Sequence, residues 1–268
     1  MMWRVRYWRE GEKIGNFGDS LSLVYMDLMF TQRCRYTFGD IYLVGSVIDA
    51  KRINEARCSG FVQGDGRGQA IFWGCGARSQ RPLEGTGLSN VQFHGVRGEL
   101  TRKALGLPIG TPIGDTALLL PRFYTPKPHN DAAGKVLWIP HFRHPDPTDM
   151  DKKDCPDLLV MRPNIENSTE GCLDMIDAIC SSSFVMANAM HAAIIACAYG
   201  IPFAFWGGTE INYPFKWSDF SSALGFNMPF AMSFAEGMEI YNRIRPDIAM
   251  SNFNGDPLLA VAPFEPRL

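Results

Sequence analysis

The residue whose type and setting best suit acid–base chemistry is His191, within the stretch SSSFVMANAMHAAIIACAYGIP at positions 181–202. Histidine titrates near neutral pH and is therefore a common general acid or base. Asn188 suits a helix N-cap, Gly200 suits a left-handed C′ position, and Pro202 blocks continuation of the helix. With that cap, His191 falls in the first helical turn, where free backbone N–H groups favour a phosphate or carboxylate. The alternative is a hydrogen-bonded core histidine, the commoner state of a lone His among Ala, Ile and Cys.

Polar residues in two other expected loops are candidates for the same site. Asn16 and Asp19 lie in GNFGD, where Asp19 is either a base for a hydroxyl group or a helix cap. Arg97 follows an expected strand in the phrase VRG and is either an anion-binding side chain or a surface ion-pair partner. Because a cation in the first helical turn opposes the helix dipole, its placement favours an anionic ligand.

Two later segments carry further side chains suited to ligand contact. The loop IPHFRH holds His141, Arg143 and His144, which either contact a ligand or are solvated. The aromatic segment PFKWSDF, interpreted as a loop, holds Lys216 and Trp217. Trp217 either stacks on a ligand or fills the core.

Bulk properties exclude several classes of protein. With 46% hydrophobic and 20% charged residues and a net charge of −2, the chain of 268 residues is typical of a soluble globular protein without a basic nucleic-acid footprint. Its seven scattered cysteines show neither CxxC nor Cys/His ligand spacing, so no metal site or disulfide framework is expected. The N-terminus does not resemble a signal peptide, and no apolar run approaches the length of a membrane span. We expect a cytoplasmic protein with reduced thiols.

The candidate residues need elements that bring them together. Apolar segments alternate with helical patterns, which predicts an α/β fold of parallel sheets covered by helices. The expected strands are residues 4–8, 42–46, 70–73, 91–96, 135–140, 158–161, 183–186 and 203–206. The expected helices are one beginning at residue 19 or 20 and those at 97–105, 173–180, 189–199 and 233–243.

A polar segment with two prolines at 126–134 is the best linker candidate, and it predicts two Rossmann-like domains. The expected divisions are an N-terminal α/β domain at 1–128, a C-terminal α/β domain at 133–245 and a C-terminal tail at 246–268. Ligands of such sheets bind beyond the carboxyl ends of the strands. GNFGD, the 96–97 junction, the HFRH loop and the His191 corner all take that position, so we expect them to face one central cleft.

Five phrases of the sequence fall in the order and at the intervals of a known family: GNFGD, FHGVRGELTRKALGL, GDTALLLP, IPHFRH and ANAMHAAIIACAYGIPFAFW. In these phrases the chain resembles the polysaccharide pyruvyltransferases over nearly its whole length. The resemblance implies a GT-B-like fold and transfer of the pyruvyl group of phosphoenolpyruvate to two hydroxyls of one sugar. The product is a cyclic ketal, in exopolysaccharide or cell-surface glycan biosynthesis.

The resemblance also implies site residues. The family's histidine matches His191, as catalytic acid, and its arginine at VRG matches Arg97. With this chemistry, the donor-binding candidates are Arg97, Asn188, His141 and Arg143. The acceptor-binding or cleft-lining candidates are Asn16, Asp19, Lys216 and Trp217. One departure is Ala189, because many members of the family carry an arginine two residues before the histidine.

Phosphoenolpyruvate is expected as donor substrate, with no further cofactor and no metal. The acceptor is expected to be a sugar or a lipid-linked oligosaccharide, with the N-terminal domain on the acceptor side. The enzyme is expected in the cytoplasm, and the resemblance implies glycan assembly at the inner membrane face, where a peripheral position is left open. Two alternatives remain. One is a GT-B glycosyltransferase that uses a nucleotide sugar, with Glu210 or Glu236 at the ribose; the other is a non-catalytic glycan-binding relative, which Ala189 favours.

Overall fold

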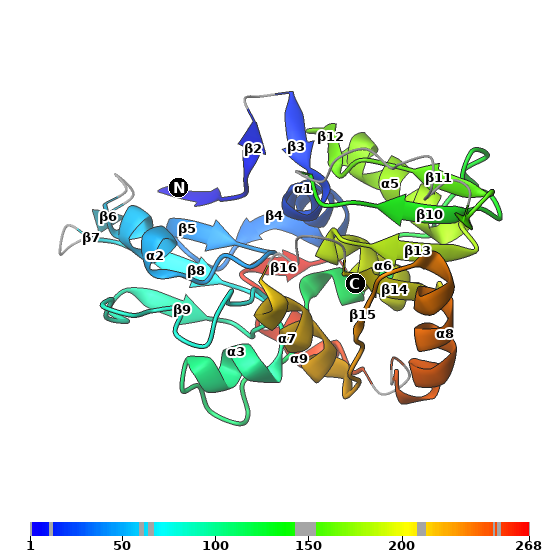
Figure 1. The fold of residues 1–268 in the computed structure, drawn as a ribbon. Helices are drawn as coiled ribbons and strands as arrows, with labels where there is room; N and C mark the ends of the chain where they lie inside the picture. The colour runs from blue at the N-terminus through cyan, green and yellow to red at the C-terminus, as the bar shows by residue number, and fades with distance from the viewer. Residues whose placement is uncertain are drawn as a thin grey trace.

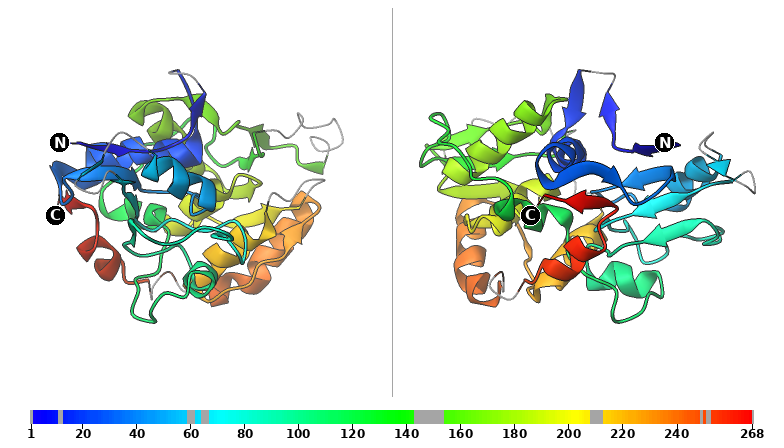
Figure 2. Two further views of the ribbon diagram at one scale, coloured as in Figure 1. Left: turned by 90° about the vertical axis from the view of Figure 1, so that its left-hand side faces the viewer. Right: turned by 180° about the vertical axis from the view of Figure 1, so that it is seen from behind.

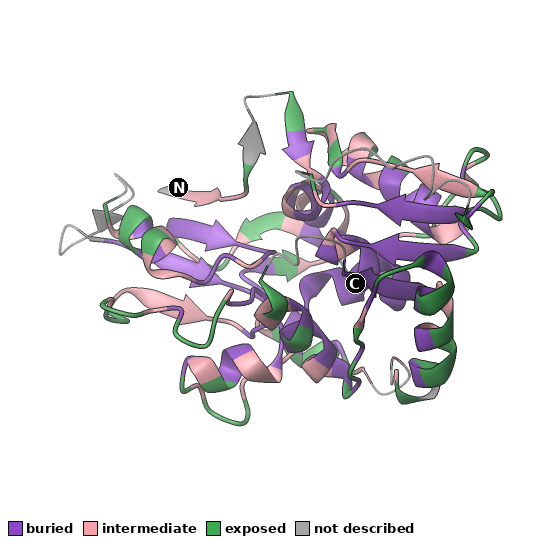
Figure 3. Ribbon diagram, viewed as in Figure 1, coloured by how far each residue is buried: buried purple, intermediate pink, exposed green. Residues whose placement is uncertain are grey.

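The computed structural model describes residues 2–10, 13–58, 62–63, 67–142, 154–207, 213–248, 250 and 253–267. These residues form an α/β architecture with two parallel sheets, one from each half of the chain (Figure 1). The α/β class expected from the sequence is thereby confirmed. The inner strands of both sheets are buried, the edge strands are partly exposed, and exposed residues concentrate on the outer helices and loops (Figure 3).

The first sheet has four parallel strands in the order β1 (Met2–Val5), β5 (Phe38–Tyr42), β8 (Ala70–Phe72) and β9 (Val91–Phe93). Strand β8 is an uninterrupted apolar run because both of its faces are covered, whereas the neighbouring β5 also buries Asp40. The accompanying helices are α2 (Ala50–Arg57), α3 (Glu99–Ala104) and the 3₁₀ helix η2 (Thr116–Arg122). A separate two-stranded ribbon is formed by β6 (Val62–Gln63) and β7 (Arg67–Gly68).

The second sheet has five parallel strands in the order β11 (Leu158–Val160), β10 (Val136–Ile139), β13 (Phe184–Ala187), β14 (Phe203–Trp206) and β15 (Phe230–Ala231). Its helices are α5 (Thr169–Ser181), α6 (Met190–Ala198), α7 (Pro214–Leu224) and α8 (Phe234–Ile244). Helix α6 is apolar on nearly all sides, which fits its burial against β13, β14 and η2.

Helix α1 joins the two halves of the molecule. It is introduced by the hairpin of β2 (Arg9–Glu10) and β3 (Ile14–Asn16), runs as α1 (Phe17–Val24) and continues as the π-helix η1 (Tyr25–Met29). Strand β3 pairs with β12 (Asn164–Glu166) of the second half, and α1 packs against α5. The buried side chains of α1 therefore belong to the same hydrophobic core as the second sheet.

The C-terminal residues return to the first half. After η3 (Arg245–Asp247), α9 (Asp256–Ala260) leads to β16 (Phe264–Pro266), which pairs with β4 (Phe30–Cys34). The indole N–H of Trp73 donates to the carbonyl oxygen of Leu258 over 2.8 Å. Figure 2 shows this red segment beside the blue N-terminal elements.

Most expected strands are present, but three expectations about the remaining segments are wrong. Strand β5 ends at Tyr42, so the strand expected at 42–46 lies earlier and its place is taken by a loop. The glycine-containing loop before α1 holds the hairpin of β2 and β3, and α1 begins at Phe17. The PFKWSDF segment is the start of α7, because Pro214 is favourable in a first helical turn and Gly225 (φ 77°) ends the helix.

Candidate active site

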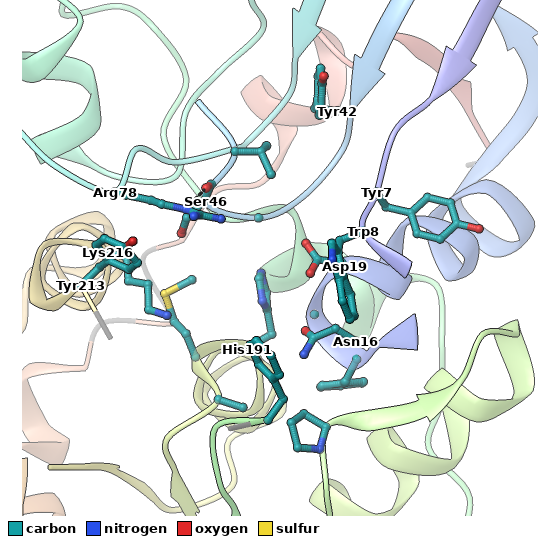
Figure 4. A pocket seen from close by; sticks show the side chains of 18 of the residues that line it. Tyr7, Trp8, Asn16, Asp19, Tyr42, Ser46, Arg78, His191, Tyr213 and Lys216 are labelled. Carbon is teal, nitrogen blue, oxygen red and sulfur yellow. Dashed lines mark hydrogen bonds between the residues drawn. The ribbon is translucent and has the colours of Figure 1, made fainter. Parts of the chain in front are cut away.

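A cavity of about 630 Å³ lies where the loops of both sheets meet. Its walls come from the segment between β1 and β2, the start of α1, the loop after β5, α2, the loops after β8, β10 and β13, and the start of α7. Figure 4 shows Arg78, Tyr213 and Lys216 on one side, Trp8, Asn16 and Asp19 on the other, and His191 between them. Three of the four loop clusters expected at one cleft line it, and the 96–97 junction does not.

His191 stands in the first turn of α6, which begins at Met190. The side chain is only 11% exposed. Its ring lies directly against Gly18 of α1, where a Cβ atom would be 2.2 Å from Nδ1. This close approach of two helices fixes the plane of the ring and leaves its edge at the wall of the cavity.

Asp115 lies behind His191. Its Oδ2 is 3.7 Å from Nε2 of His191, and its side chain is fully buried. Its other oxygen, Oδ1, caps η2 by accepting from the backbone N–H of Ala117 (3.0 Å). Within the described residues neither Oδ2 nor Nε2 has a hydrogen-bond partner, so each is the natural electrostatic partner of the other. Sequence reasoning missed Asp115; the signal was a Gly-Asp pair opening an otherwise apolar run.

Asp19 is in the first turn of α1 and lines the cavity. It does not cap the helix, because Asn16 occupies the N-cap position. Burial raises the pKa of its carboxyl group, and the nearby side chains of His191 and Arg78 act in the opposite direction. A carboxylate made more basic by burial is suited to accept a proton from a hydroxyl group.

Lys216 lines the cavity from the first turn of α7. Burial lowers the pKa of its ammonium group to about 8, and the positive charges of Arg97 and Arg78 contribute to the same shift. Asp19 opposes it. A lysine held next to other cations is a common feature of sites that bind anions.

Trp217, the neighbour of Lys216, does not line the cavity. Only 2% of its surface is exposed. Its ring packs between Phe205 (4.6 Å between ring centroids) and Phe230 (5.6 Å). The expectation that it contacts a ligand is therefore corrected: its consecutive position on the helix turns it into the core.

Arg97 is fully buried and does not line the cavity. Its Nε donates to Oδ2 of Asp219 (3.0 Å), and a terminal nitrogen lies 2.9 Å from the same oxygen. Its other terminal nitrogen donates to Oγ of Ser46 (2.6 Å). Both sequence interpretations, a donor contact and a surface ion pair, are corrected, because tertiary packing satisfies this guanidinium internally.

Asn188 also has a structural position. Its side chain is buried and donates through Nδ2 to the carbonyl oxygen of Trp206 (3.3 Å), while Ala189 occupies the N-cap position. The expected cap and ligand contact are therefore both replaced by a bond to the neighbouring strand. His141 does line the cavity, beside Phe142, whereas Arg143 lies outside the described residues.

The remaining candidates concern the alternatives. Glu236 accepts a hydrogen bond from the backbone N–H of Met232 at the start of α8 and does not line the cavity, and Glu210 lies outside the described residues. Nowhere in the described ranges do three His, Cys, Asp or Glu side chains gather as metal ligands would. None of the helices in those ranges combines the length and the apolar character needed to cross a bilayer.

Comparison with known proteins identifies the class. Residues 31–205, well over half of the chain, match the family model of the polysaccharide pyruvyl transferases. The chain therefore belongs to the polysaccharide pyruvyl transferase family, as its sequence motifs indicated. The solved structure of a functionally uncharacterised protein from Klebsiella pneumoniae aligns with 87% of this chain and 93% of that chain, at 16% identity and a TM-score of 0.46. The chain has no significant match among curated proteins.

Proposed function

We propose that this protein transfers the pyruvyl group of phosphoenolpyruvate to two hydroxyls of one sugar and so forms a cyclic ketal. The observation that carries the proposal is the position of His191. It stands on the wall of a polar cavity, between a carboxylate, Asp19, and two cations, Arg78 and Lys216. Membership of the polysaccharide pyruvyl transferase family supports the same reaction class.

In the proposed reaction His191 protonates the methylene carbon of phosphoenolpyruvate, which becomes a methyl group. The adjacent carbon turns electrophilic, and a sugar hydroxyl attacks it while Asp19 takes the hydroxyl proton. Phosphate then leaves with the bridging oxygen, and the second hydroxyl closes the ring. Two hydroxyl protons are released in all: one replaces the proton that His191 gave, and the other leaves with phosphate. General acid catalysis of this kind contributes roughly 10²–10⁴-fold to the rate.

The arrangement supports a division of labour like that of GT-B enzymes. The second half supplies His191 on α6 and Lys216 on α7, which would face the donor together with Arg78 of the first half. The first half also supplies Asp19, which would face the acceptor. The acceptor would be a sugar with a free diol, either soluble or lipid-linked, used in glycan assembly. A cytoplasmic enzyme that docks at the inner membrane face would meet such acceptors.

The experiment follows phosphate release from phosphoenolpyruvate with a panel of hexoses and N-acetylated hexoses, and detects the ketal by mass spectrometry. The wild type is compared with His191→Ala and with His129→Ala, which removes a histidine outside the cavity. We expect acceptor-dependent phosphate release that His191→Ala reduces by roughly 10²-fold or more. Near-normal ketal formation by His191→Ala contradicts the mechanism.

The same preparation separates the alternatives. Thermal stabilisation by nucleotide sugars, without stabilisation by phosphoenolpyruvate, would favour the glycosyltransferase. Binding of glycans with no phosphate release from phosphoenolpyruvate under any acceptor would favour the non-catalytic relative.

A further inference from the structure

The charges around the cavity are unevenly compensated. At the end formed by α2, every cation faces a carboxylate. Arg6 and Lys51 both lie within ion-pair distance of Glu55, at 4.0 and 3.8 Å. Arg52 pairs with Asp49. This end therefore has little need of an anionic ligand.

Two further cations of the cavity wall, Arg78 and Lys216, have no carboxylate within ion-pair distance in the described part of the chain. Arg78 donates through Nε to the carbonyl oxygen of Ser46 (2.8 Å), and its guanidinium lies 5.5 Å from the ring centroid of Tyr213. The ammonium of Lys216 lies 5.7 Å from the ring centroid of Trp217. These contacts leave the terminal N–H groups of Arg78 and all three of Lys216 without acceptors among the described residues.

Such a pair is electrostatically unfavourable. The two half-buried cations repel each other, and the nearby guanidinium of Arg97, although paired with Asp219, also disfavours the positive charge on Lys216. Removing charges from water without pairing them costs free energy. A bound dianion offsets that cost, and charge-assisted hydrogen bonds to a phosphate are among the strongest that a protein makes.

The pair is also held rigidly, through one buried side chain. Arg97 bonds to Asp219, one turn beyond Lys216 on α7, and so fixes the helix that presents the ammonium. The same guanidinium donates to Oγ of Ser46, whose carbonyl oxygen holds Arg78. Arg97 is therefore a positioning residue for both cations and does not itself reach the cavity.

We propose that Arg78 and Lys216 form the subsite for the phosphate of the donor, an assignment that rests on the proposed function. His191 lies between this pair and Asp19 (Figure 4), so a donor anchored here by its phosphate presents its methylene carbon toward the imidazole. The acceptor sugar then lies across His191 from this pair, on the side of Asp19 and the aromatic ring of Trp8.

The test measures the affinity for phosphoenolpyruvate, and separately for inorganic phosphate, by isothermal titration calorimetry of the full chain. The variants are Lys216→Met and Arg78→Gln. The control is Lys103→Met, which removes an exposed lysine of α3 outside the cavity. We expect each cavity variant to weaken both ligands roughly 10- to 100-fold, the range for a charge-assisted bond, and the control to bind as the wild type does.

Scanning calorimetry is used to check that each variant is folded. Wild-type affinity for both ligands in folded Lys216→Met and Arg78→Gln overturns the subsite, while the proposed function stands if ketal formation is observed. Conversely, the wild type could fail to bind phosphoenolpyruvate but bind phosphate or a nucleotide sugar, with that binding lost in both variants. This result supports an anion subsite at Arg78 and Lys216 and contradicts the proposed function. A wild type that binds none of these anions overturns both.

Discussion

Replacing Gly18 with alanine tests the position of His191 most directly. Gly18 lies in the first turn of α1 with helical backbone angles, so alanine suits the backbone there. The added Cβ, however, would lie 2.2 Å from Nδ1 of His191 and 2.8 Å from its Cγ. Ordinary contacts of a Cβ begin at about 3.4 Å, so the imidazole must retreat by more than 1 Å along that line.

Two opposing effects set the stability of Gly18→Ala. Alanine is favoured over glycine in a helix by up to about 1 kcal/mol. Overpacking against the imidazole costs about 1–3 kcal/mol. The net loss of stability is therefore about 0–3 kcal/mol. A displacement of about 1 Å in a catalytic group, in contrast, lowers turnover on the order of 10²-fold.

The assay combines the rate of acceptor-dependent phosphate release with the Tm from scanning calorimetry. Gly110→Ala is the matched control, because a Cβ there would meet nothing within 4 Å. We expect wild-type turnover from Gly110→Ala and roughly 10²-fold slower turnover from Gly18→Ala, which stays folded with a Tm lower by up to about 10 °C. Wild-type turnover by a folded Gly18→Ala protein would refute the placement of His191 at the reacting carbon.

Three further outcomes are expected. Asp115→Asn keeps an oxygen for capping η2 but removes the negative charge beside His191. The kcat should therefore fall roughly 10-fold or more, with little change in the affinity for phosphoenolpyruvate. An equal loss in kcat and in affinity would contradict a role of Asp115 in positioning His191. The pKa of Lys216 is lowered to about 8, so its ammonium group is present below that pH and lost above it. In the wild type the Kd for phosphoenolpyruvate should therefore rise as the pH passes about 8. The same pH titration of Lys216→Met should not show this rise in Kd. Arg97→Met leaves Asp219 buried without its cation. It should lower the free energy of unfolding, measured by urea titration, by about 3–5 kcal/mol, and Arg97→Met/Asp219→Leu should recover part of that loss. An unchanged urea midpoint for Arg97→Met would contradict the pairing.

The parts of the fold that sequence reasoning predicted are those with a local physical cause. Strands β10 and β14 are continuous apolar runs because both faces are covered, and both were expected within about a residue or two of their bounds. The start of α6 is a similar case. Even though Ala189 replaces Asn188 as the cap, the first turn still contains His191.

The parts that failed depend on contacts between distant residues. Arg97 has the residue type and the strand-end position of an anion-binding side chain, and nothing in its neighbourhood points to Asp219, 122 positions further on. Asp115 lies opposite His191 only because η2 packs against α6. Periodicity and capping signals report what lies within a few residues, so such pairings are invisible to them.

Ala189 stands where the family resemblance leads to the expectation of an arginine, two residues before His191, and the cavity holds other cations. Ala189 lines the cavity at the N-cap of α6 and contributes only a methyl group. The positive charge of the cavity wall stands instead on Arg78 and Lys216. Because a phosphate is recognised by the sum of nearby donors, a cation can move between walls without altering the charge at the site. Reintroducing the charge by Ala189→Arg should therefore restore donor binding to Lys216→Met, and failure to do so would show that the two positions are not equivalent.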